Sequence, residues 1–83
     1  MTCKIAFKKS VARDLKKIDK AQAERILQKI EQELPSKAKT LPVLTGQFAG
    51  LRKFRAGEYR VIFSIVGDTA LVLRIRHRRD VYR

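Results

Sequence analysis

Two glycine–acid pairs, Gly57-Glu58 and Gly67-Asp68, constrain the fold of this chain more than any other feature. Each pair separates segments rich in β-branched and aromatic residues, and a glycine at such a position is typical of a two-residue hairpin turn. Turns this short join neighbouring strands, so the pairs predict a three-stranded antiparallel meander. The predicted strands cover residues 51–56, 59–66 and 69–76.

The N-terminal half predicts a strand followed by two helices. Residues 4–7 alternate polar and apolar side chains, as a short strand does. Ser10 is expected to cap the first helix and Asp19 the second, which carries Gln22 at the capping-box position. The second helix is expected to end at Pro35. Apolar residues at helical spacing mark the buried faces: Val11, Leu15 and Ile18, then Ala23, Ile26, Leu27, Ile30 and Leu34.

Residues 35–50 contain both prolines and two of the four glycines, so we expect an irregular connection there. Its anchoring apolar residues are expected to be Leu41, Val43, Leu44 and Phe48. The order of elements indicates an α+β fold, in which a helical hairpin lies on one face of a four-stranded sheet made by the N-terminal strand and the meander. At this length we expect a single domain over residues 1–83.

Composition narrows the classes of function. The formal net charge is +12, from 20 basic and 8 acidic residues, which suits nucleic acid, the ribosome, an anionic membrane or an acidic protein. With one histidine and no acidic cluster, we expect no metal site or other cofactor, and Cys3, the single cysteine, cannot form an intramolecular disulfide. No apolar run approaches the roughly 20 residues of a membrane span, so we expect a cytoplasmic protein.

Alternation along the predicted strands separates apolar from charged side chains. The face toward the helices is expected to hold Tyr59, Val61, Phe63, Ile65, Leu71, Leu73 and Ile75. The opposite face is expected to hold Lys53, Arg55, Arg60, Ile62, Ser64, Val72, Arg74 and Arg76. Like charges on neighbouring strands destabilise a sheet, so this pattern favours a cationic binding face over a merely solvated polar face.

The last ten residues contain five arginines, the only histidine and one of the two tyrosines. Arginine grips phosphate through two parallel hydrogen bonds, so this tail predicts a phosphate-bearing partner. Tyr82 is expected to stack on a base or to act as a general base, unless it only seals the edge of the core. His77 either assists proton transfer or is a polar surface residue.

These residue types fit the cleavage of RNA by its own 2′-hydroxyl, a reaction that needs no metal. It needs a base to accept the 2′-proton, cations around the phosphate as charge builds up, and a proton donor for the leaving 5′-oxygen. Lysine, arginine and tyrosine side chains can supply all three.

Two segments resemble motifs of the RelE/ParE toxin superfamily. Residues 51–63, LRKFRAGEYRVIF, resemble its strand–turn–strand LRKYRVGDYRVIY, and residues 75–83, IRHRRDVYR, resemble its I-x-H-R-x-D/E-V-Y ending. The resemblance spans essentially the whole chain and implies a RelE-like toxin domain. In the RelE branch it implies a ribosome-dependent endoribonuclease that cleaves mRNA in the ribosomal A site and is neutralised by a cognate antitoxin.

The resemblance also implies roles for single residues. Lys53 matches the active-site lysine of the sheet, and Arg60 matches the arginine that binds the scissile phosphate. Arg78 matches the tail arginine that stabilises the transition state or protonates the leaving group, and Tyr82 matches the tail tyrosine. The general base is Tyr82 or Lys53. Leu51 stands where the best-known RelE site has a second lysine, so part of that cluster is missing or replaced. Further RNA contacts are expected from Arg52, Arg55, Arg74, Arg76, His77, Arg79 and Arg83.

Two other functions stay open: a ParE-like toxin that poisons gyrase without nuclease activity, and a non-catalytic RNA- or DNA-binding module. The tail arginine and tyrosine argue against the first, because the ParE branch usually lacks them. The expected partners are a cognate antitoxin with an acidic segment and a ribosome carrying mRNA in its A site. A heterotetramer or a larger toxin–antitoxin complex is one expected assembly.

Overall fold

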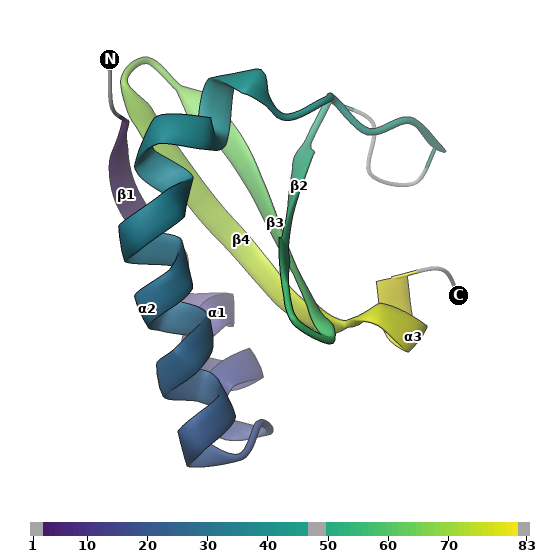
Figure 1. Ribbon diagram of the computed structural model, residues 1–83. Coiled ribbons are helices and arrows are strands. Elements are labelled where there is room, and N and C mark those ends of the chain that lie inside the picture. Colours follow the sequence, from purple (N-terminus) through teal and green to yellow (C-terminus); the bar gives the residue numbers. More distant parts are fainter. Residues whose placement is uncertain (1–2, 47–49, 82–83) are drawn as a thin grey trace.

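Figure 1 shows a layer of helix packed on a twisted sheet. A computed structural model describes residues 3–46 and 50–81, without the side chains of residues 80 and 81. The elements in chain order are β1 (Lys4–Phe7), α1 (Lys9–Lys16), α2 (Lys20–Lys37), the 3-10 turn η1 (Ala38–Thr40), β2 (Arg52–Ala56), β3 (Tyr59–Val66), β4 (Thr69–His77) and α3 (Arg78–Val81).

The sheet has the strand order β1-β4-β3-β2. Strands β2, β3 and β4 form the predicted antiparallel meander, and β1 pairs in parallel with β4. A parallel pair needs a long crossover, and the α1–α2 hairpin is part of the chain that supplies it. The predicted α+β fold is therefore confirmed, with β1 and β2 as the two edge strands of the sheet.

Both glycine–acid pairs form the predicted hairpin turns. Ala56 pairs with Tyr59 across the first turn, and Val66 pairs with Thr69 across the second. Gly57 and Gly67 both have φ of 61°, a left-handed conformation that glycine adopts without strain. The short turns fix the register of β2 and β4 against β3, and this register determines which charged side chains meet.

The core lies between α2 and the sheet. Ile26, Ile30 and Leu34 of the predicted stripe are buried, and they join a cluster with Val61 and Phe63 of β3. Val61 and Phe63 are fully buried, which confirms the predicted inner face of β3. At roughly 25 cal/mol per Å² of apolar surface, burial of these side chains is the main force that holds α2 on the sheet.

The predicted inner face of β4 is wrong in its first half. Ala70 and Val72 are fully buried in the core, whereas Leu71 and Leu73 are only half-buried. The register shows the reason, because Ile62 pairs with Arg74 while Phe63 pairs with Val72, so Leu73 is an extra residue on β4. A β-bulge of this kind shifts the alternation by one residue, and no sequence pattern announced it.

Two predicted helix boundaries and one predicted cap bond also need correction. Ser10 lies inside α1, and its hydroxyl donates to the Leu73 carbonyl at 2.6 Å instead of capping the helix. Asp19 occupies the N-cap position of α2 without a side-chain cap bond. Helix α2 continues through Pro35 to Lys37, because buried residues on either side, Leu34 and Ala38, hold the last turn against the core.

The connection before β2 is irregular, as predicted. Leu41 and Leu44 are partly buried and anchor it, but Val43 is 51% exposed, contrary to expectation. Val43 instead forms an isolated backbone bridge with Arg52. Phe48, the fourth predicted anchor, lies outside the described residues.

Candidate nucleic-acid interface

Three arginines form a row across the sheet, on the side opposite the α2-packed core. Arg60 of β3 pairs directly with Arg55 of β2 and with Arg76 of β4. Residues directly opposite on neighbouring strands project on the same side, so the three side chains share one face. None of the three forms an ion pair with an acidic side chain of the described residues. We call Arg55, Arg60 and Arg76 the arginine row.

The centre of this face is less exposed than the sequence predicts. Arg60 is only 8% exposed and Ile62 is fully buried, although Ile62 stands outside the main core cluster. The Nη1 group of Arg60 donates to the carbonyls of Gly57 and Tyr59, each at 3.3 Å. Arg60 is therefore held in place by neutral acceptors, and its positive charge is not cancelled by them.

Lys53 of β2 and Arg74 of β4 lie next to the arginine row along their strands. Both pair with Ile62 of β3, which lies between them. Lys53 is half-buried there. Arg74 makes a two-pronged contact with Asp14 of α1, from Nε to Oδ2 at 2.9 Å and from Nη2 to Oδ1 at 3.1 Å. The prediction that Arg74 contacts RNA stays untested, and this contact gives Arg74 a role within the fold.

Asp14 is a key residue that the sequence reasoning missed. It is 7% exposed, and its Oδ2 also accepts the backbone N–H of Ile75 at 2.9 Å. Burial would raise the pKa of Asp14, but hydrogen bonds from Arg74 and Ile75 and the charges of Arg74 and Arg76 lower it below its usual value. Helix α1 thus fastens the bulged part of β4, where β1 no longer pairs with it. A charged residue at an inward helix position is the only sequence signal for this site.

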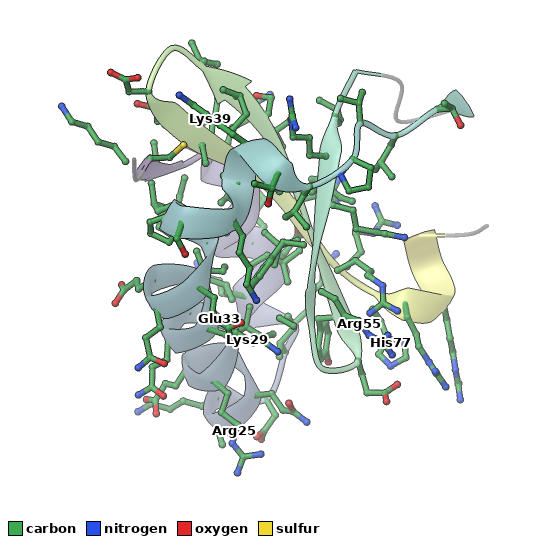
Figure 2. The ribbon with its side chains drawn as sticks, turned by 45° about the horizontal axis from the view of Figure 1, so that its top comes forward. Arg25, Lys29, Glu33, Lys39, Arg55 and His77 are labelled. Carbon is green, nitrogen blue, oxygen red and sulfur yellow. The ribbon has the colours of Figure 1, made fainter. Side chains whose placement is uncertain are left out.

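The tail begins with contacts to the β2–β3 turn. The rings of His77 and Tyr59 meet edge to face with their centroids 5.4 Å apart. Arg78 forms an ion pair with Glu58, from Nε to Oε2 at 3.0 Å, and its backbone N–H donates to the Glu58 carbonyl at 2.8 Å. The Arg79 backbone N–H donates to Nδ1 of His77 at 3.2 Å. Figure 2 shows Arg55 and His77 at this end of the sheet, beside α3.

Not every predicted contact residue reaches the arginine row. Arg52 pairs with core-facing Phe63, and its Nη1 donates to the carbonyls of Lys39 and Leu41 at 3.1 and 2.6 Å, so it holds the connection instead. Arg79 is exposed on α3. Tyr82 and Arg83 lie outside the described residues.

Two cavities border this region. One of about 230 Å³ lies beside α1 and the end of β4, and is lined by Asp14, Lys17, Ile18, Tyr59, Arg74, Ile75, Arg76 and His77. Another of about 460 Å³ separates α2 from β2 and is lined by Lys29, Glu33, Lys37, Leu41, Phe54, Arg55, Gly57 and Glu58. Within the described part of the chain, no group of His, Cys, Asp and Glu side chains is placed to bind a metal, and no helix is long and apolar enough to cross a membrane.

Comparison with known proteins identifies the group to which this fold belongs. The sequence matches the family described as ParE toxin of type II toxin–antitoxin system, parDE, over residues 5–82. The chain belongs to this family. It is thus a member of the RelE/ParE toxin superfamily, as its two motifs predict, and a toxin of a type II toxin–antitoxin system. A search of curated proteins gives no match.

Solved structures support the same relationship for this ParE-family toxin. The RelBE2 toxin–antitoxin complex of Mycobacterium tuberculosis contains a chain with a TM-score of 0.83 and 23% identity, covering 94% of this chain and 100% of that one. A chain of the chromosomal ParDE system of P. aeruginosa has a TM-score of 0.74 and 16% identity, covering 92% of this chain and 96% of that one. A chain of the archaeal RelE–RelB complex of Pyrococcus horikoshii has a TM-score of 0.65 and 29% identity, covering 94% of this chain and 97% of that one. Both branches of the superfamily thus share this fold.

Proposed function

We propose that this toxin is a ribosome-dependent endoribonuclease that cleaves mRNA in the A site and thereby inhibits translation. The arginine row supports the proposal most directly. Three like charges on adjacent strands oppose folding of the sheet, and guanidinium groups are well matched to phosphate. The row ends close to the tail, whose arginine and tyrosine carry the resemblance to the RelE branch.

The proposed reaction uses side chains alone. The 2′-oxygen of the RNA attacks the adjacent phosphorus, the bond to the 5′-oxygen breaks, and the products are a cyclic phosphate and a free 5′-hydroxyl. Arg60 binds the non-bridging phosphate oxygens and stabilises their growing negative charge. Arg78 stabilises the transition state or protonates the 5′-oxygen, and Tyr82 or Lys53 accepts the 2′-proton. Arg55 and Arg76 hold the flanking backbone.

A cognate antitoxin is the proposed partner that silences this toxin. The solved relatives include complexes of a toxin with its antitoxin. The formal net charge of +12 favours a partner with an acidic segment, which would cover the arginine row. The neutralised state is proposed to be a heterotetramer or a larger complex.

A defined message in a purified translation system tests the proposal. We expect new 5′ ends inside A-site codons when toxin and ribosomes are both present, and none when ribosomes are omitted. Added antitoxin should abolish the cuts. An intact message under translating conditions would contradict the nuclease assignment.

Tyr82→Phe separates a catalytic from a stacking role of the tail tyrosine. The substitution keeps the ring and removes the hydroxyl, so a general-base role predicts a loss of cleavage of about 10²-fold or more. A stacking role predicts little change in Tyr82→Phe and a large loss in Tyr82→Ala. The measurement is the initial rate of A-site cleavage. If both variants keep the full cleavage rate and growth arrest, Tyr82 takes no part in the reaction and Lys53 becomes the better candidate for the general base.

Poisoning of DNA gyrase is the second candidate, because the matched family is that of ParE toxins. A supercoiling assay with purified gyrase distinguishes the two. Inhibited supercoiling together with an intact message would favour the gyrase function, and the reverse would favour the nuclease.

A further inference from the structure

The turn between β2 and β3 contacts both arginines to which the proposed chemistry assigns a role on the phosphate. Its Gly57 carbonyl accepts from the Arg60 guanidinium, and its Glu58 binds Arg78. We propose that Glu58 is a positioning residue, which sets the Arg78 guanidinium beside Arg60 so that both act on one phosphate. The inference rests on the proposed nuclease function and adds to it a residue outside the arginine row.

Glu58 holds Arg78 at two points. The Glu58 carbonyl accepts the Arg78 backbone N–H at 2.8 Å, where β4 gives way to α3. The Glu58 carboxylate forms an ion pair with the Arg78 guanidinium, with Oε2 3.0 Å from Nε. One residue therefore fixes both the start of α3 and the direction of the Arg78 side chain, and Figure 1 shows α3 beside this turn.

The geometry of the ion pair fits a Glu58 that positions Arg78 for RNA better than a Glu58 that keeps Arg78 away from RNA. A carboxylate that withheld Arg78 from RNA would occupy two of its donors with hydrogen bonds, as Asp14 does with Nε and Nη2 of Arg74. Here the contact given for the ion pair joins Oε2 of Glu58 to Nε, at the inner side of the guanidinium. Among the described residues no hydrogen bond engages the Arg78 terminal nitrogens, and the Arg78 side chain is 53% exposed, so Nη1 and Nη2 can reach a phosphate while Glu58 keeps its hold.

Arg60 is placed by the same turn, which makes the two positions interdependent. Its Nη1 contacts the carbonyls of Gly57 and Tyr59, which flank Glu58 in the chain. The Tyr59 ring packs on His77, the residue before Arg78. The turn and the start of α3 thus form one packed unit, and a shift of Glu58 would move Arg78 relative to Arg60.

The exposure of the pair separates a positioning role from a structural one. The Arg78 and Glu58 side chains are 53% and 58% exposed. Surface ion pairs of this kind add little to folding stability, so loss of the carboxylate should leave the thermal unfolding temperature nearly unchanged. A fall in cleavage rate without a fall in stability would therefore report on the placement of Arg78.

The test compares Glu58→Gln and Glu58→Asp with Asp68→Asn, using A-site cleavage on programmed ribosomes. Asp68 is the matched control, because it is the acid of the other glycine–acid turn and faces Lys39 at 3.7 Å, away from α3. We expect Glu58→Gln to lower kcat about 10-fold or more with little change in KM, since a group misplaced by about 1 Å can cost about 10²-fold. Glu58→Asp should recover part of the rate, and Asp68→Asn should match wild type.

A second measurement reads the Arg78 side chain without cleavage. The Nε–H signal of Arg78 in a proton–nitrogen NMR spectrum should move in Glu58→Gln and stay in place in Asp68→Asn. An unmoved signal, or a Glu58→Gln variant that cleaves at the wild-type rate, would overturn the positioning role while the nuclease function stands. An intact message with wild-type toxin would instead remove the nuclease function, and the inference with it.

Discussion

Arg60→Ala is expected to lower the rate of A-site cleavage by about 10²–10³-fold, the usual cost of removing one preorganised donor to a transition-state anion. Arg60 is at the centre of the arginine row and is only 8% exposed, so little water can replace its hydrogen bonds. Arg60→Lys should lose nearly as much, because lysine keeps the charge but not the planar fork. The measurements are the initial cleavage rate and growth arrest on induction.

The control for Arg60→Ala must also lose one positive charge, but at a position away from the arginine row. Arg25→Ala serves, because Arg25 is exposed on α2, on the helix side of the molecule in Figure 2. Both variants lower the net charge by one, but only Arg60→Ala should lose activity. Equal, small losses in the two variants would mean that net charge alone matters and that Arg60 makes no special contact. A thermal melt checks whether Arg60→Ala remains folded.

The strands were predictable because their signals are local. The Gly57-Glu58 and Gly67-Asp68 turns lie between alternating segments, and together they determine a meander and its register. The bulge at Leu73 was not predictable, since it depends on contacts with residues that are distant in the sequence. Ser10 of α1 binds the Leu73 carbonyl, and β1 pairs with β4 only as far as Val72. The parallel pairing of β1 with β4 likewise depends on the crossover connection and not on residues 4–7 themselves.

The candidate site divides in the same way. The shared face of Arg55, Arg60 and Arg76 follows from strand period and turn length, which are local properties. The roles of Asp14 and Glu58 depend on partners 60 and 20 positions away along the chain, at Arg74 and Arg78, and no local pattern marks them. Contacts between elements therefore decide which arginines are held by acids and which keep their charge for a ligand.

Asp14→Ala is expected to lower the free energy of unfolding by about 3 kcal/mol, a large loss for a domain whose total is on the order of 5–15 kcal/mol. The variant leaves the Ile75 N–H and the Arg74 guanidinium without their shared acceptor. This loss is at the lower end of the range for removing one partner of a buried ion pair. The reason is that the Arg74 side chain is 42% exposed, so water screens its charge. Urea unfolding of both proteins measures the difference.

Asp19→Ala is the matched control, because Asp19 is exposed and makes no side-chain cap bond, so its loss should be well below that of Asp14→Ala. Asp14→Asn should fall in between, since the amide keeps one acceptor oxygen for the Ile75 N–H. Equal stability of the Asp14→Ala and Asp19→Ala variants would contradict the fastening of β4 by α1.

The stability that Asp14 contributes should depend on pH in a direction set by its lowered pKa. In the unfolded chain the pKa of an aspartate is about 3.9, so the native state binds the Asp14 proton less readily than the unfolded state does. The contribution is fully present above about pH 4 and is lost as the pH falls through the lower, folded pKa. The stability difference between wild type and Asp14→Ala should therefore be constant near neutral pH and shrink in acid. A difference that grows in acid would mean that burial outweighs the contacts from Arg74 and Ile75, and that Asp14 is held in its neutral form.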